Sequence, residues 1–359
     1  MNPDPANNPP ETQANDTSLD NSTNKGAATN GGLMALLQNK SFQNIFKVGV
    51  VCVVLLFLSI TIYRVYGELR DKEQLISASR IRFGYLVASI AVTIIALVPA
   101  AIAWLGVLKA FGQNFPILPA LDAYYLGHAG KYVPGKAMVL VLRVGKLQPY
   151  GVSIKPAILS VFVETLTGVG TAAILGVLFL FLIDVPSWLK WSLVAAAPLA
   201  AIVLSPYFFR LMLFALAKSK IGKIPKSLSS AFTWKFMLKT CLGMSIGWLL
   251  QGTVGWLIIL CLNDSPEMVS LQIWGTAVSA VCLGAVAGFA SMLPGGAVAR
   301  DLVVAWLLAP VLTQPIALLF ALFLRIANLS GEGISIAAVH ICKRLFAAPP
   351  KSRTTRGDA

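Results

Sequence analysis

Long apolar runs separated by short polar stretches dominate the pattern of this 359-residue chain. Several runs reach about 20 residues without a charge, which is the length that a helix needs to cross a hydrocarbon core. The runs lack the strict alternation of barrel strands, so they favour helices. We therefore predict an all-α polytopic membrane protein with about eight transmembrane helices. The predicted spans are 48–63, 83–108, 156–183, 191–209, 240–262, 269–293, 298–312 and a last helix that ends near 341.

The two ends of the chain have a different composition. Residues 1–35 are rich in Asn, Thr, Pro, Ser and Asp, and we expect them to form a disordered polar tail. Residues 45–345 are expected to form one helical transmembrane domain, with a basic disordered tail at 346–359. We see no sign of a soluble domain.

The chain is 57% hydrophobic, 12% charged and carries a formal charge of +14. Cytoplasmic loops of membrane proteins are enriched in Lys and Arg, so topology explains this charge and no nucleic-acid partner is expected. The basic 210–239 loop and the basic C-terminal tail predict that both termini are cytoplasmic, in a plasma (inner) membrane. The 64–82 loop opposes this topology, because its five basic residues would lie outside.

Candidate enzyme chemistry is sparse. The five cysteines form no CxxC pair and there are only two histidines, so neither a disulfide framework nor a metal site is indicated. No P-loop motif is present, and the acidic residues are scattered. We expect no cofactor and no catalytic residue, and we predict that the protein is not an enzyme.

The segment 126–153 is too polar for a plain span and too apolar for a plain loop. Its flanks 118–126 and 137–144 are helical in pattern, whereas Pro134 and Gly135 break a helix between them. We predict two short helices joined at a Pro-Gly turn, as in a re-entrant hairpin. Broken backbone at membrane depth is tolerated only where protein or a wet cavity surrounds it.

Three basic residues accompany this turn: Lys131, Lys136 and Arg143. The free N–H groups at the start of the second short helix attract anions, so these residues are candidates for binding an anionic group. The alternatives are that Arg143 snorkels to the interface and that the lysines are cytoplasmic anchors.

A second Pro-Gly turn occurs at Pro294 and Gly296, shortly before Arg300. If both turns belong to hairpins, the two hairpins enter from opposite sides and form an inverted repeat, a common transporter plan. Arg300 is then a second substrate-binding candidate, and the turn residues of both hairpins are structural or gating candidates.

Glu164 lies inside an otherwise charge-free run, where a carboxylate is costly and usually has a partner or a function. We expect it to pair with Arg143 or Arg300 and to take part in substrate binding, although a protonated structural role is the alternative. Arg325 and Glu332 share one face of the last helix. An internal clamp between them is at least as plausible as a substrate contact.

At these motifs the chain resembles the membrane region of lysylphosphatidylglycerol synthases and their flippase-like relatives, over about residues 45–345. The pattern departs from the family at Thr165, where an Arg is usual after the Glu, and at Val298, where a Gly is usual. The residues that carry the resemblance are 130–136 (Gly-Lys-Tyr-Val-Pro-Gly-Lys), Arg143, 151–153 (Gly-Val-Ser), Pro294-x-Gly296 and Arg300-Asp301, where the family usually has Arg-Glu.

The resemblance implies a lipid-handling domain, and because the chain shows no synthase domain we expect no lipid aminoacylation. Our first hypothesis is a flippase-like transporter of an anionic, aminoacylated or lipid-linked lipid, which binds the headgroup phosphate at the broken helices. Its partners would be membrane phospholipids. The main alternative is an accessory subunit of a separately encoded lipid-modifying or glycosyl-transferring enzyme. A membrane-embedded enzyme and a small-solute transporter are further alternatives.

Overall fold

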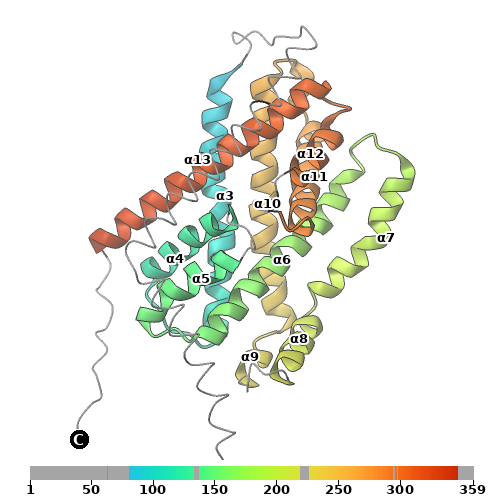
Figure 1. Cartoon of the computed structure of the whole chain (residues 1–359). Helices are drawn as coiled ribbons and strands as arrows, with labels where there is room; N and C mark the ends of the chain where they lie inside the picture. The colour runs from blue at the N-terminus through green and yellow to red at the C-terminus, as the bar shows by residue number, and fades with distance from the viewer. Residues whose placement is uncertain are drawn as a thin grey trace, which may run out of the picture. The chain divides into compact units, whose positions relative to one another are not determined.

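The computed structural model describes residues 63, 81–132, 137–218, 226–293, 296 and 298–346, which all belong to one compact unit. These residues form helices and no strand, so the predicted all-α class is confirmed for this part of the chain. The elements (Figure 1) are α3 (Phe83–Ala110), α4 (Ile117–Ala129), η2 (Gly130–Tyr132), α5 (Ala137–Leu147), η3 (Gln148–Tyr150), α6 (Ile154–Leu180), α7 (Ser187–Val203), α8 (Pro206–Lys218), α9 (Lys226–Ser230), α10 (Trp234–Leu262), η4 (Pro266–Met268), α11 (Leu271–Ala290), α12 (Ala299–Leu308) and α13 (Gln314–Phe346).

Among the described residues, five helices are long and apolar enough to cross a membrane, namely α3, α6, α10, α11 and α13. The bent pair of α7 and α8 makes six if it counts as one span. The predicted number of eight is therefore not confirmed. The predicted span 48–63 lies outside the described residues apart from Tyr63. The predicted span 298–312 contains α12, which has ten residues and is about 15 Å long, half of what a crossing requires.

The predicted span 191–209 is also interrupted. Helix α7 ends at Val203, α8 begins at Pro206, and the two axes differ by 62°. Proline has no N–H to donate and disfavours helical backbone at the residue before it. Pro206 therefore explains a bend that the apolar composition of the run does not reveal.

Helices α3 and α10 form an antiparallel pair. The backbone N–H of Arg82 donates to the carbonyl of Cys261 at 3.0 Å, which joins the start of α3 to the end of α10. At the opposite end, the rings of Phe111 and Phe232 lie 5.7 Å apart. Gly247 allows a close crossing, because a Cβ there would lie 3.3 Å from the carbonyl oxygen of Ala96.

Two helical hairpins start from opposite ends of this pair (Figure 1). Helix α4 follows the end of α3 and folds back as α5, whereas α11 follows the end of α10 and folds back as α12. The two arms of each hairpin approach closely. A Cβ at Gly130 would lie 2.7 Å from the backbone nitrogen of Val139, and one at Gly296 would lie 2.9 Å from the Cα of Gly288. Pro134, Gly135 and Pro294 lie outside the described residues.

Helix α13 runs obliquely across the other helices and packs against α3, α4, α10 and α12 (Figure 1). It joins two apolar clusters. One surrounds α11 and α12 and includes Phe320, and the other surrounds α4 and α5 and packs against Ile336. Gly331 lets α13 approach α3, since a Cβ there would lie 2.6 Å from Cγ2 of Thr93. The last helix therefore contacts both hairpins.

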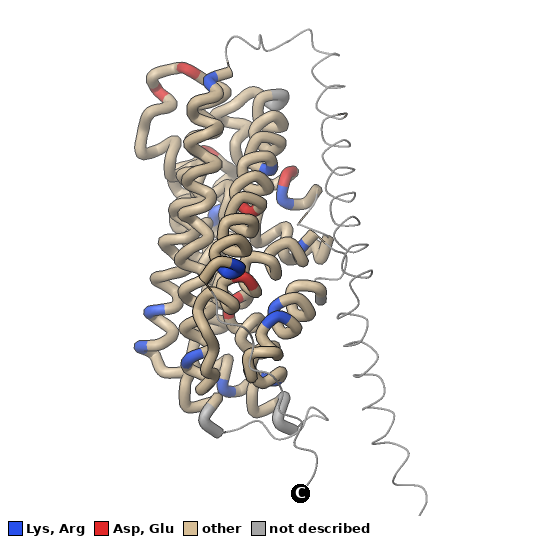
Figure 2. The backbone as a smooth tube through the Cα atoms, turned by 90° about the vertical axis from the view of Figure 1, so that its left-hand side faces the viewer, with Lys and Arg blue, Asp and Glu red and all other residues tan. Residues whose placement is uncertain are grey.

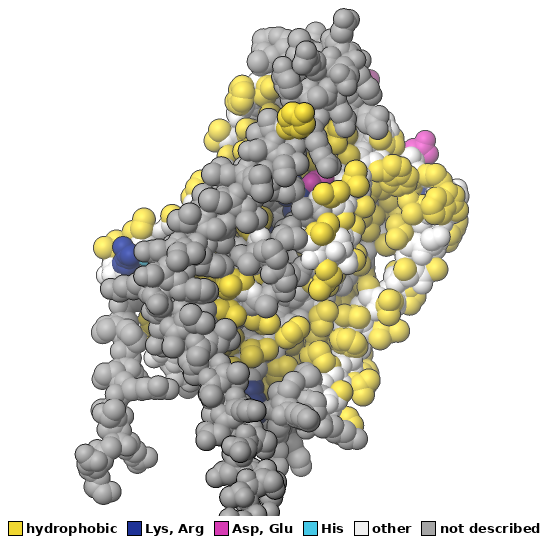
Figure 3. All heavy atoms as spheres, in the orientation of Figure 1, with side chains coloured by type: hydrophobic (Ala, Val, Ile, Leu, Met, Phe, Trp, Pro, Cys, Tyr) yellow, Lys and Arg dark blue, Asp and Glu magenta, His cyan; other side chains and the backbone are white. Residues whose placement is uncertain are grey.

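Basic residues mark the lower end of the described helices and acidic ones lie near the upper loops, while further residues of both charges lie within the bundle (Figure 2). Apolar side chains cover much of the described surface between the two ends (Figure 3). This distribution is the one expected of helices that face lipid. Large exposed apolar residues include Val87, Ile95, Ile102, Leu178, Trp188, Trp191, Leu199, Leu211, Leu238 and Leu242.

Candidate functional site

A buried ion pair joins the first hairpin to α6. Nη1 of Arg143 donates to Oε2 of Glu164 at 2.8 Å, and the two side chains are 2% and 11% exposed. The hydroxyl of Tyr124 donates to Oε1 of Glu164 at 3.4 Å. Of the two arginines predicted as partners of Glu164, Arg143 is thus the one that forms the ion pair. Because the Arg143 side chain lies inside the protein, the snorkelling interpretation does not hold.

The position of Arg143 depends on aromatic rings and on a glycine. Its guanidinium carbon lies 4.3 Å from the ring centre of Tyr124 and 4.9 Å from that of Trp104, within the range of cation–π attraction. A Cβ at Gly127 would lie 2.5 Å from Cγ of Arg143, so only glycine leaves room for this side chain. Its Nε has no hydrogen-bond partner among the described residues.

The tip of the first hairpin is bonded to α13. Nζ of Lys131 donates to Oε1 of Glu332, and the hydroxyl of Tyr132 donates to Oε2 at 3.1 Å. Glu332 is buried, whereas about a third of the Lys131 side chain is exposed. The carboxylate of α13 therefore holds both polar residues of η2.

The second hairpin is also bonded to α13. Nε of Arg325 lies 3.1 and 3.2 Å from the two carboxylate oxygens of Asp301, and Nη2 donates to the same carboxylate. Arg325 and Glu332, predicted as an internal clamp along α13, thus pair with residues of two different hairpins. The spacing of Arg325 and Glu332 along one helix face did not predict these pairs, because the partners lie on other helices.

Arg300 lies beside these pairs and has no hydrogen-bond or ion-pair partner among the described residues. It is within electrostatic range of Arg325, Asp301, Tyr132 and Glu332. The hairpin tips thus bring together three cations and two carboxylates on α12, α13 and η2, a net charge of +1. We call Lys131, Glu332, Arg300, Asp301 and Arg325 the tip cluster. Lys136, the remaining predicted cation, lies outside the described residues.

The backbone beside Arg300 is strained. Val298, which caps α12 at its start, has φ 66° and ψ −62°, a conformation that β-branched residues avoid. This is the position where the sequence departs from the usual glycine. The turn that presents Arg300 is therefore built for a residue without Cβ.

A third charged group lies at the end of the bundle where α4 begins. Oδ2 of Asp122 accepts from Lys343 at 2.7 Å and from Lys146 at 3.2 Å, and Nδ1 of His340 lies 3.0 Å from Oδ1. Sequence reasoning missed this group. Asp122 is the one acid in an otherwise uncharged helix, and this would have been the signal.

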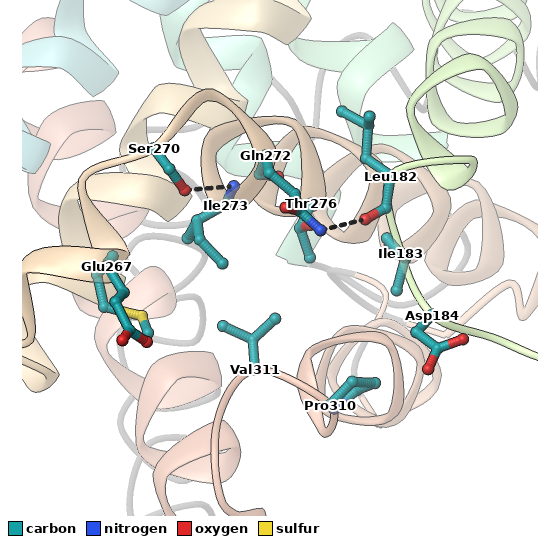
Figure 4. A pocket seen from close by; sticks show the side chains of 11 residues that line it. Leu182, Ile183, Asp184, Glu267, Ser270, Gln272, Ile273, Thr276, Pro310 and Val311 are labelled. Carbon is teal, nitrogen blue, oxygen red and sulfur yellow. Dashed lines mark hydrogen bonds between the residues drawn. The ribbon is translucent and has the colours of Figure 1, made fainter.

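A hollow of about 440 Å³ opens at the opposite end, between α6, α11 and α12. Figure 4 shows Asp184 and Glu267 on different sides of it, with Gln272 donating to the carbonyl of Leu182 at 3.5 Å. None of the predicted site residues lines this hollow. It is therefore separate from the tip cluster.

Comparisons with known proteins place the chain in a family. Searches of curated proteins and of solved structures found no match. The sequence profile of the family described as "Lysylphosphatidylglycerol synthase TM region" matches residues 44–331, which is well over half of the chain and includes both hairpins. Together with the apolar helices, this match shows an integral membrane protein with a domain related to lipid handling. The chain therefore belongs to the lysylphosphatidylglycerol synthase TM region family.

Proposed function

We propose that this protein is a flippase-like transporter, which binds the phosphate of a lipid headgroup at the tip cluster and moves it between leaflets. The family match supports lipid handling in general. The specific support comes from the tip cluster, where Arg300, which has no hydrogen-bond or ion-pair partner in the described part of the chain, lies beside ion pairs inside an apolar bundle. Ionisable residues in such positions are costly and commonly mark a substrate pathway.

The burial of the cluster fits a site inside a membrane. Arg325 and Glu332 of α13 are both buried among apolar helices, and ionisable residues in such surroundings commonly face the interior of a helix bundle. In this proposal the C-terminal end of α13, with Lys343, faces the cytoplasm, and the hairpins are re-entrant from opposite sides.

The net charge of the cluster fits an anionic ligand. Three cations face two carboxylates, so one negative charge would neutralise the group. A phosphate would bind Arg300 first, because this guanidinium gives up no bond to any residue that the structure describes. It would then compete with Glu332 for Lys131, which is the more exposed partner of that pair. Loss of the Lys131–Glu332 bond would free the first hairpin from α13.

The Arg143–Glu164 pair fits the resting state of this cycle. It ties α5 to α6 while the site is empty, and the acyl chains of the lipid would remain in the bilayer outside the bundle. Exchange of one arginine partner for a phosphate would let the hairpin move. The sequence has no P-loop motif, so in this proposal the movement is driven by a gradient, by a partner or by nothing beyond the lipid's own distribution.

The test is lipid movement in liposomes that contain the purified protein. Movement of a fluorescent phosphatidylglycerol is followed by dithionite quenching for wild type, Arg300→Ala, Arg300→Lys and the control Arg344→Ala, which changes an exposed arginine at the end of α13. Hydrogen bonds to a charged group contribute about 1.5–3 kcal/mol, so Arg300→Ala is expected to slow movement about tenfold or more. Arg344→Ala should move lipid at the wild-type rate.

Two outcomes would overturn the proposal. One is an Arg300→Ala protein that remains folded by size-exclusion chromatography and moves lipid at the wild-type rate. The other is a wild-type protein that accelerates neither anionic nor aminoacylated lipids. The accessory-subunit hypothesis would then take its place, and co-purification of an enzyme would be the next observation to seek.

A further inference from the structure

His128 lies in the last turn of α4, directly before the tip of the first hairpin. Its ring centre is 5.3 Å from that of Tyr124. Nδ1 is shielded from solvent and has no hydrogen-bond partner among the described residues. A shielded ring nitrogen without a partner is costly, because neither water nor protein satisfies it.

Two cations act on this imidazole from different elements. Arg143 of α5 lies over the same Tyr124 ring, and Lys131 of η2 follows three residues later in the chain. Each cation is bonded to a carboxylate, Arg143 to Glu164 and Lys131 to Glu332. The cations that act on His128 thus belong to the buried pair and to the tip cluster.

The other elements packed against α4 add no carboxylate bonded to His128. Helix α3 contributes Trp104, whose ring does not titrate. Helix α13 contributes Glu332 and, nearer the start of α4, His340 and Lys343, which are bonded to Asp122. The charges that act on His128 are therefore those of Lys131 and Arg143.

This arrangement links proton binding to anion binding. Burial of the ring disfavours a charged imidazolium, and the two neighbouring cations add to this effect, so the ring is neutral while the site is empty. An anionic headgroup at Lys131 and Arg300 cancels part of that repulsion and makes protonation of the ring more favourable. By linkage, the two bindings favour each other to the same extent.

We infer that His128 takes up a proton when an anionic headgroup binds, so that headgroup and proton move together. This inference rests on the proposed function and identifies its energy source as a proton gradient. The proton comes from water on the side where the headgroup enters, binds the imidazole lone pair, and returns to water where the headgroup leaves. One phosphodiester charge and one proton cancel, which lowers the cost of crossing an apolar region.

The test is calorimetric titration of the full chain in detergent with two probes that carry the same phosphodiester. These are dihexanoyl phosphatidylglycerol and sn-glycero-3-phosphoglycerol, which lacks the acyl chains. Each titration is repeated in two buffers of different ionisation enthalpy, so that the number of protons taken up is measured directly. The variants are His128→Gln, His128→Asn and the control His340→Gln, which changes the second of the two histidines in the chain.

For the wild type we expect an uptake approaching one proton for each ligand bound. The Kd should increase as the pH rises, by up to about tenfold per pH unit in the range where the uptake is largest. Both His128 variants should bind without proton uptake and with a Kd that does not change between pH 6 and pH 8. His340→Gln should behave as the wild type. Binding of both probes would show that the site recognises the headgroup. Binding of the short-chain lipid alone would show that the site recognises the acyl chains as well.

The failures can be told apart. Wild-type binding without proton uptake would overturn the inference and leave the flippase proposal standing. Proton uptake that persists in both His128 variants, or that disappears in His340→Gln, would assign the proton to another group and overturn it as well. A wild type that neither binds the probes nor moves lipid would overturn the proposed function and this inference together.

Discussion

The buried pair of Arg143 and Glu164 allows a quantitative prediction. Removal of one partner of a buried ion pair leaves an uncompensated charge, which typically costs about 3–5 kcal/mol. In Arg143→Met the carboxylate of Glu164 would retain one contact, the Tyr124 hydroxyl at 3.4 Å. We therefore expect Arg143→Met to lower the free energy of unfolding by an amount in that range.

The reverse change should cost less. In Glu164→Leu the guanidinium of Arg143 keeps the faces of Trp104 and Tyr124 at 4.9 and 4.3 Å. Cation–π contacts of this kind contribute about 0.5–2 kcal/mol. Glu164→Leu should therefore lower the free energy of unfolding by less than Arg143→Met does, with a difference of about that size. The structure thus predicts an asymmetry between the two single variants.

The double variant separates the pair from the two side chains. Replacing a buried ion pair by apolar residues is often neutral, so Arg143→Met with Glu164→Leu should be more stable than either single variant. The assay is equilibrium unfolding in mixed detergent micelles, followed by tryptophan fluorescence. Additive losses in the double variant, or single variants as stable as the wild type, would refute the reasoning that the pair is coupled and buried.

Two further predictions concern backbone geometry. Gly252→Ala should lower stability by about 1–3 kcal/mol, since its Cβ would lie 2.3 Å from Cγ2 of Val278, whereas Gly145→Ala, with nothing within 4 Å, should be neutral or stabilising. Val298→Gly should raise stability by about 0.5–1 kcal/mol, because relief of a positive φ outweighs the entropy cost of glycine. Val303→Gly, inside α12, should instead lower it. Thermal unfolding in detergent measures all four, and equal effects within either pair would contradict these accounts.

Sequence reasoning found the features that depend on local pattern. The Pro-Gly turns predicted that the chain folds back, and in the described residues α4 packs against α5 and α11 against α12. Re-entrance is not confirmed, because α11 has 20 residues and is long enough to cross a membrane. A carboxylate in an apolar run predicted a buried partner for Glu164, and Arg143 supplies it. The family resemblance also marked Val298, which stands where a Gly is usual, and the backbone of this residue has a positive φ.

The features that it missed depend on contacts between distant segments. Asp122 and Lys343 are 221 positions apart, and Asp301 and Arg325 belong to helices whose facing sides no periodicity specifies. The number of spans is not confirmed, for a different reason. Hydropathy measures composition and not direction, so it could not show that Pro206 bends one apolar run or that α12 ends after ten residues.

The charged residues of α13 explain how the two hairpins are linked. Arg325, Glu332 and Lys343 are separated by seven and eleven residues, so they lie on one line along the helix, which spans about 27 Å. Each is bonded to a different segment, namely α12, η2 and α4. A rigid helix bonded in this way cannot shift at one hairpin without stretching its bonds to the other. If a ligand displaced Glu332 from Lys131 and α13 shifted, the bond between Arg325 and Asp301 would be stretched. The two hairpins would then respond to one binding event.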